Sequence, residues 1–168
     1  GASAPSVHDS CDSCTRRALR GRSALGDVDP ERVHAERLSG LLQSGFLPVL
    51  APLTHDGKGN ILNTNADTIA SETASTLASS YKVRLIYCFE KQGVLQDIDD
   101  EASVIPLITS AIYTELRASG AIAKGMIPKM DNAFMALKRG VSSVIITHAD
   151  SVLHLGQQSL VGTAITLE

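Results

Sequence analysis

The chain has 168 residues, of which 43% are hydrophobic and 20% charged, and its formal net charge is −3. This composition is typical of a soluble domain with a sizeable core. The small negative charge excludes a general attraction to nucleic acid or to an anionic membrane. No apolar run approaches the roughly 20 residues that span a bilayer, and residues 1–5 lack the features of a signal peptide. We therefore expect a cytoplasmic protein whose residues 1–168 form one domain or part of one.

Three cysteines fit a reducing compartment, because an odd number builds no disulfide framework. Cys11 and Cys14 have the spacing of a redox motif, but no βαβ pattern surrounds them, so we interpret the pair as accidental. Cys88 falls in an apolar run and is expected to be a small core residue.

The first part of the chain is expected to hold one helix, one buried strand and one reversal. Residues 1–25 show no clear period and should be irregular. A helix is expected over residues 30–45, with Val33, Leu38, Leu41 and Leu42 on its buried side and Gly45 as its stop. Residues 46–51 form a short apolar run that is typical of a strand covered on both faces. The Asp-Gly and Gly-Asn pairs within residues 56–60 then indicate a hairpin.

The second part alternates apolar strands with amphipathic helices. This alternation predicts an α/β sandwich around a mostly parallel sheet. The expected elements are helices over 67–80, 109–119 and 128–139, strands over 83–89, 141–147 and 163–167, and a polar loop over 90–103.

Asn63, Asn65 and Asp67 stand at i, i+2 and i+4 between a turn and a helix-forming run. In an extended chain, residues two apart point the same way, so two amides and a carboxylate would project from one side. Open α/β sheets bind ligands where their strands end, which makes a binding site one interpretation. A polar loop is the other, because Asn and Asp are common turn residues.

Pro128 suits the first turn of a helix, and Lys129 follows just inside that helix. A lysine there lies against the positive end of the helix dipole and is badly placed unless an anion shares the site. Phosphate is the obvious anion, and a solvated surface lysine is the alternative.

These segments and others, taken in order, resemble the acetylglutamate kinases of the amino acid kinase superfamily. The resemblance is dense from about Gly26 onward and weak over the first 25 residues. It implies a three-layer αβα sandwich with a mainly parallel sheet. The motifs that carry it are Pro48-Val49-Leu50-Ala51-Pro52, Asn63-Thr64-Asn65-Ala66-Asp67, Gly93-Val94-Leu95, Gly125-Met126-Ile127-Pro128-Lys129 and Gly162-Thr163-Ala164-Ile165.

The resemblance also implies roles for single residues. Asp67 matches the aspartate that organises two catalytic lysines, and Lys129 matches the second of those lysines. Asn63 matches an asparagine that holds the amino acid substrate, and Asn65 lies beside it in the same pattern. Phosphoryl transfer depends on positioning and charge neutralisation, which suits residues of these types.

Two stretches match the loops that contact the nucleotide in relatives. The first departs from the usual Thr-Asp-Val-x-Gly-Val form over residues 88–91, although contacts in this loop are largely made by the backbone. The expected nucleotide-binding residues are Glu90, Lys91, Gln92, Gly93, Val94 and Leu95 in the first stretch, and Ala121, Ile122 and Ala123 in the second.

The resemblance implies transfer of the γ-phosphoryl group of ATP, with Mg2+ as counter-ion, to the side-chain carboxylate of N-acetyl-L-glutamate. It further implies a place in arginine biosynthesis and a homodimer. N-succinyl-L-glutamate as substrate, or a noncatalytic nucleotide-binding module of the same fold, stay open as alternatives. The chain has no Gly-Gly pair and no candidate strand before residue 46, so we expect the C-terminal part of the enzyme, unable to turn over alone.

Overall fold

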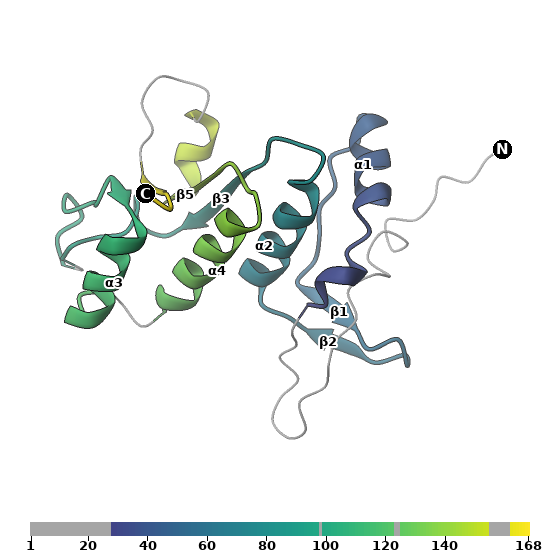
Figure 1. The fold of residues 1–168 in the computed structure, drawn as a ribbon, viewed down its shortest axis with the longest axis horizontal. Helices are drawn as coiled ribbons and strands as arrows, with labels where there is room; N and C mark the ends of the chain where they lie inside the picture. Colours follow the sequence, from purple (N-terminus) through teal and green to yellow (C-terminus); the bar gives the residue numbers. More distant parts are fainter. Residues whose placement is uncertain (1–27, 98, 123–124, 155–161) are drawn as a thin grey trace. The chain divides into compact units, whose positions relative to one another are not determined.

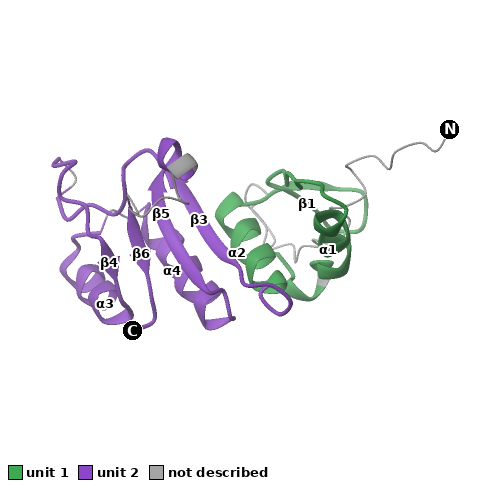
Figure 2. Cartoon of the chain, turned by 90° about the horizontal axis from the view of Figure 1, so that it is seen from above, with its two compact units in different colours: residues 1–77 green, residues 78–168 purple. Residues whose placement is uncertain are grey.

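The computed structural model describes residues 28–97, 99–122, 125–154 and 162–168 (Figure 1). The chain divides into two compact units, residues 1–77 and 78–168 (Figure 2). Each unit is described by itself. Cys11 and Cys14, and the irregular segment expected over residues 1–25, lie outside the described residues.

The described part of the first unit contains two helices and an antiparallel hairpin. The hairpin joins its strands through a turn in which the Asp56 carboxylate accepts hydrogen bonds from the backbone N–H groups of Lys58 and Asn60. The Asn60 side chain donates a further bond of 2.6 Å to Asp56, and these bonds hold the pKa of Asp56 below its usual value. The expected reversal is therefore confirmed. The elements are η2 (Pro30–Arg32), α1 (Ala35–Gln43), β1 (Leu53–His55), β2 (Ile61–Asn63) and α2 (Ala66–Leu77).

Helix α1 is shorter than the expected helix, because a 3-10 turn and two non-helical residues precede it. Gly45 follows α1 with φ of +82°, a left-handed conformation that suits glycine as a helix stop. Leu42 is 39% exposed, so the expectation that it is buried was wrong. Leu38 is the buried residue of α1, and it packs with Val33 and Ile69.

The strand expected over residues 46–51 is absent. The structure gives this run no regular secondary structure, and Phe46, Leu47 and Val49 are 64%, 87% and 78% exposed. A strand needs a hydrogen-bonded neighbour, and the described residues of this unit form only the β1–β2 pair, which residues 46–51 do not join. The apolar run alone could not reveal that.

The second unit is built on a four-stranded sheet in the order β3-β5-β6-β4. Strands β3 and β5 are parallel, β4 and β6 are parallel, and β5 and β6 are antiparallel, so the expected mainly parallel sheet is confirmed. The elements are β3 (Arg84–Phe89), β4 (Leu107–Ile108), α3 (Ser110–Ser119), α4 (Ile127–Lys138), β5 (Ser143–His148), η3 (Ala149–His154) and β6 (Thr163–Ile165).

The core of the second unit lies between the sheet and helix α4. Val144 and Ile146 on β5 and Met130 and Ala133 on α4 are all 0% exposed. Helices α3 and α4 lie side by side (Figure 1), and their contact includes a stacked pair of rings, Tyr113 and Phe134, with centroids 5.1 Å apart. Met130 and Ala133 thereby fix α4 against the strands, and the ring stack joins α3 to it.

The predicted ends of α3 and α4 are confirmed. Thr109 caps α3 by accepting a hydrogen bond from the N–H of Ile112, and Gly120 and Gly140 follow the two helices with positive φ. The two-residue strand β4 was not predicted, because it is too short to leave an alternating pattern. Cys88 is exposed on β3, an edge strand of the sheet, so the prediction of a core cysteine was wrong. Among the described helices, none combines the length and apolar character that a bilayer crossing requires.

Candidate active site

The Asn-x-Asn-x-Asp motif spans the passage from strand β2 to helix α2. Asn63 is the last residue of β2, and Asn65 caps α2, since its Oδ1 accepts a hydrogen bond of 2.8 Å from the backbone N–H of Asp67. Thr64, between the two asparagines, is buried and hydrogen-bonds Thr54 at 2.7 Å. Asn63 and Asn65 are therefore exposed on the opposite side of the chain from Thr64.

Asp67 lies within the first turn of α2, so the extended geometry expected for all three motif residues holds only up to Asn65. A carboxylate is favoured near a helix N-terminus because it faces the positive end of the dipole. The position of Asp67 thus has a local structural reason in addition to its expected catalytic role.

Lys129 lies in the first turn of α4, directly after Pro128, as the sequence predicts. Its ammonium group is 5.0 Å from the centroid of the Tyr87 ring, and the ring belongs to a residue that is only 3% exposed. The lysine is half-buried. The alternative of a fully solvated surface lysine therefore does not describe its surroundings.

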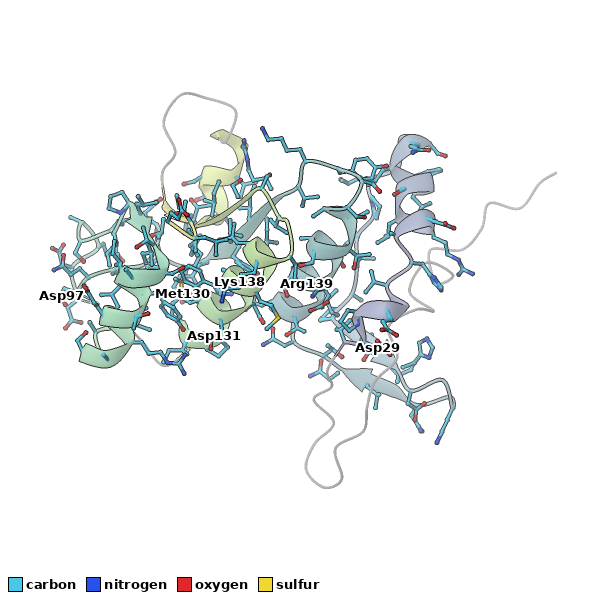
Figure 3. All side chains as sticks on the ribbon, in the orientation of Figure 1. Asp29, Asp97, Met130, Asp131, Lys138 and Arg139 are labelled. Atoms are coloured by element: carbon cyan, nitrogen blue, oxygen red, sulfur yellow. The ribbon has the colours of Figure 1, made fainter. Side chains whose placement is uncertain are left out.

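The two residues that follow Lys129 have different environments (Figure 3). Met130 is fully buried, whereas the Asp131 carboxylate accepts a hydrogen bond of 2.7 Å from the Tyr113 hydroxyl and lies 3.4 Å from Arg117. Burial, and then the hydrogen bond to Asp131, raise the pKa of Tyr113 to about 12. These contacts hold the start of α4 against α3.

A cavity of about 970 Å³ lies within the second unit, where β3 ends. Of the predicted nucleotide residues, Gln92 does not line it, and its side chain accepts a hydrogen bond from Ser151 instead. Ala123 lies outside the described residues. The predicted residues that line the cavity are Glu90, Lys91, Gly93, Val94, Leu95, Ala121 and Ile122.

The cavity has further lining residues that the sequence did not single out. They fall in or beside the two predicted stretches, so nearness in sequence was the signal that could have found them. Met126 is the N-cap of α4, which puts the first turn of that helix next to the cavity edge. The further lining residues are Phe89, Gln96, Asp97, Asp100, Ser103, Gly120, Gly125 and Met126.

Thr163 fixes the loop that forms the cavity wall. Its hydroxyl accepts a hydrogen bond of 2.8 Å from the N–H of Val94 and donates one of 2.7 Å to the carbonyl of Ile105. Gly93 packs so closely that a Cβ there would lie 2.6 Å from Thr163 Oγ1. At Gly162, with φ of +146°, a Cβ would lie 2.5 Å from the carbonyl oxygen of Ile146. The Gly-Val and Gly-Thr motifs therefore belong to one structural unit.

Local hydrogen bonds hold the acidic run of Asp97, Asp99, Asp100 and Glu101, which follow the Gly93-Val94-Leu95 motif. The Asp97 and Asp100 carboxylates accept bonds from the backbone N–H groups of Asp99 and Ala102. Lys91 pairs with Glu101 at 2.6 Å, and this contact raises the pKa of Lys91 and lowers that of Glu101. The run is thus an ordered loop that contributes to the cavity.

Among its described residues, the cavity wall contains one cationic side chain and three carboxylates. Lys91 supplies the positive charge, and Glu90, Asp97 and Asp100 supply the negative charge. In the described part of the chain, no group of three or more His, Cys, Asp and Glu side chains could hold a metal ion. The charges and the volume suit a polar organic ligand of nucleotide size.

The sequence profile of the amino acid kinase family matches residues 6–148. The acetylglutamate kinase of Cytophaga hutchinsonii is 50% identical over 153 residues, which cover 90% of this chain and 58% of the relative. The acetylglutamate kinase of Phocaeicola vulgatus is 56% identical over 128 residues, covering 76% of this chain and 49% of the relative. The chain thus spans about half the length of the curated relatives it matches.

Solved structures lead to the same fold. The crystal structure of smu.665 from Streptococcus mutans matches with a TM-score of 0.76 at 28% identity, covering 96% of this chain and 59% of that one. Carbamate kinase of Giardia matches with a TM-score of 0.64 at 18% identity, covering 86% of this chain and 50% of that one, a likeness of fold alone. By its sequence and its αβα architecture, this chain belongs to the amino acid kinase family.

Proposed function

We propose that the complete protein transfers the γ-phosphoryl group of ATP to the side-chain carboxylate of N-acetyl-L-glutamate. Relatives named acetylglutamate kinase that are 50% and 56% identical to this chain support the proposal. A place in arginine biosynthesis, a cytoplasmic location and a homodimeric assembly follow from the same resemblance and are proposed with it.

The cavity of the second unit is the proposed ATP site, and it is the observation that carries the function. Of the residues expected to bind nucleotide, Glu90, Lys91 and Gly93–Leu95 from the first stretch and Ala121 and Ile122 from the second line this one cavity. A volume of about 970 Å³ is at the upper end of the range found for small-molecule sites, so a nucleoside triphosphate is accommodated.

Charge suggests how ATP lies in this cavity. The carboxylates of Asp97 and Asp100 would repel phosphates but can accept hydrogen bonds from ribose hydroxyls. Gly125 and Met126, which also line the cavity, lead into the N-terminus of α4, where backbone N–H groups without a helical partner favour anions. We therefore assign the nucleoside to the acidic loop and the phosphates to the start of α4.

Lys129 is the proposed catalytic cation. The transferred group carries high negative charge in a loose transition state, and a lysine in the first turn of α4 adds to the positive potential of the helix N-terminus. Mg2+ would enter as part of the metal–ATP substrate and would neutralise phosphate charge.

For the first unit we propose the roles that the resemblance implies. Asn63, exposed at the end of β2, binds the acylated amino acid. Asp67 is the carboxylate that orients catalytic lysines. Asn65 caps α2, so its side chain contributes mainly by holding the chain that carries Asn63 and Asp67.

An ADP-release assay on the longest natural form of the protein tests this function. With ATP and Mg2+, we expect turnover of ~1–100 s⁻¹ that depends on N-acetyl-L-glutamate. Faster turnover with N-succinyl-L-glutamate would show that this compound, and not N-acetyl-L-glutamate, is the substrate. Saturable ATP binding without ADP release, with either acceptor, would instead show a noncatalytic nucleotide-binding module.

A further inference from the structure

We propose that Tyr87 is a positioning residue for Lys129: its buried ring holds the lysine ammonium group in place before ATP arrives. The inference rests on the proposed catalytic role of Lys129. It adds a residue of strand β3 whose side chain acts through the lysine and does not itself touch the phosphates.

The geometry of the contact is fixed on both sides. Tyr87 lies in the middle of β3, directly opposite Ile146 of β5, and is 3% exposed. Lys129 lies in the first turn of α4, and the next residue of that helix, Met130, is 0% exposed. A strand and a helix that are both anchored in the core thus set the 5.0 Å separation between the ammonium group and the ring centroid.

The contact lies beside the cavity. Side chains alternate along a strand, so Tyr87 and Phe89 point to the same side of β3, and Phe89 lines the cavity. On α4, Met126 lines the cavity and comes three residues, about one helical turn, before Lys129. Both partners therefore neighbour residues of the proposed ATP site.

Electrostatics explains why the ring is needed. The positive end of the α4 dipole repels a cation in the first turn when no anion is bound. The face of an aromatic ring carries negative charge density and attracts an ammonium group within about 6 Å. The ring of Tyr87 offsets the repulsion and limits the rotamers that the Lys129 side chain can adopt. Lys129 is thereby held close to its working position.

A preorganised cation should affect the chemical step more than the binding of substrates. If the ring is lost, Lys129 is held less firmly and more of its ordering falls within the reaction step, which lowers kcat. We expect Tyr87→Leu to reduce kcat about five- to thirtyfold, with the KM for ATP changed less. This range corresponds to about 1–2 kcal/mol at 1.36 kcal/mol per tenfold change. Tyr87→Phe keeps the ring and should stay within about twofold of the natural enzyme.

A matched control separates positioning from a general loss of core packing. Phe134→Leu removes another buried ring from the same unit, one that stacks on Tyr113 and not on the lysine. It should lower the melting temperature about as much as Tyr87→Leu while leaving kcat nearly unchanged. A kcat loss of equal size in both variants would overturn the proposal.

The ring contact has its own readout, which does not depend on activity. In the longest natural form of the protein with 13C-dimethylated lysines, the ring current of Tyr87 should displace the Lys129 signal upfield. Lys129→Arg assigns the signal, and the displacement should persist in Tyr87→Phe and vanish in Tyr87→Leu. No displacement in the natural protein would overturn the contact.

The two measurements together distinguish this inference from the proposed function. Suppose that Tyr87→Leu loses the displacement of the Lys129 signal but keeps a normal kcat, while Lys129→Ala abolishes turnover. This result would overturn positioning by Tyr87 and leave the kinase function standing. Normal turnover in Lys129→Ala would overturn the catalytic role of the lysine, and with it the inference.

Discussion

The two compact units differ in how much apolar surface each buries within its described part. In residues 78–168, large side chains such as Ile108, Met130 and Ile146 are 0% exposed. In residues 28–77 the core cluster consists of Val28, Val33, Leu38 and Ile69, which are 6–9% exposed, while Phe46 and Leu47 are 64% and 87% exposed.

This difference matters for the site, because each unit carries a different part of it. The proposed nucleotide residues rest on a self-contained core that also fixes Lys129. Asn63 and Asp67, by contrast, lie at the junction of a three-residue strand and a helix. Fewer buried contacts imply easier local opening. We therefore expect the nucleotide side to be preformed and the acceptor side to be the less stable of the two.

The largest effect is expected from Lys129→Ala, because removing one group that stabilises developing charge typically costs ~10²–10³ in rate. The residue is only half-buried, so the melting temperature should change far less than kcat. Steady-state kinetics and a melting curve of the complete enzyme check this. A kcat near normal would contradict the role assigned to the lysine.

Gly93→Ala should destabilise the second unit. The new Cβ would lie 2.6 Å from Thr163 Oγ1 and 3.1 Å from the Thr163 backbone nitrogen, and would disturb the bond that Thr163 accepts from Val94. Overpacking of this kind costs about 1–3 kcal/mol, and ATP affinity should fall with it. Denaturant unfolding and ATP titration measure the two effects.

Gly40→Ala is the matched control in the first unit. A Cβ at Gly40 meets nothing within 4 Å, and the residue lies within α1, so the change should be neutral or stabilise by about 0.5–1 kcal/mol. Equal destabilisation by both changes would mean that the close approach at Gly93 is unimportant.

Asn63→Ala should weaken binding of the acylated amino acid and leave ATP binding almost intact. Loss of a hydrogen bond made in ground and transition states alike raises KM more than it lowers kcat, here roughly two- to tenfold from about 0.5–1.5 kcal/mol. Asn60→Ala is the control, because that side chain bonds Asp56 within the hairpin turn. If only ATP affinity fell, the assignment of Asn63 to the acceptor would be wrong.

Tyr113→Phe should change how stability depends on alkaline pH. The pKa of Tyr113 is raised to about 12 in the folded state, against 10.0 for the free side chain. The unfolded chain therefore loses this proton first, and stability falls as pH rises from 10 toward 12. Removing the hydroxyl should flatten that decline, as urea unfolding at several pH values can measure. An identical decline in the variant would contradict the raised pKa.

The smallest effect is expected from Glu101→Gln. The Lys91–Glu101 pair is short, at 2.6 Å, but its side chains are 36% and 76% exposed, and exposed ion pairs contribute little. The melting temperature should change slightly at low salt and not at all at 1 M salt. A large, salt-independent loss would show that the acidic loop depends on this pair.

The sequence predicted the second unit better than the first. Its strands and helices have clear periods and glycine stops, as at Gly120 and Gly140, and the nucleotide stretches fell on one cavity. The failures arose where burial depends on neighbours. Residues 46–51 and Cys88 have the composition of core residues, but no local pattern reports whether a strand or helix covers them.

The candidate site shows the same limit at finer scale. Motif spacing located Asn65 but could not show that its side chain caps a helix. The ring of Tyr87 beneath Lys129 joins residues 42 positions apart in sequence, and Thr163 joins loops at 94 and 105. Contacts of this kind arise from tertiary packing, so periodicity and spacing contain no signal for them.

The central claim is that the cavity of the second unit is the nucleotide site. Hydrogen exchange, measured with and without a non-hydrolysable ATP analogue, tests this claim most directly. We predict that the analogue slows exchange over residues 93–97, 120–122 and 125–126, which line the cavity, and leaves the β1–β2 hairpin almost unchanged. Protection confined to residues 53–67, or no protection at saturating analogue, would contradict the account.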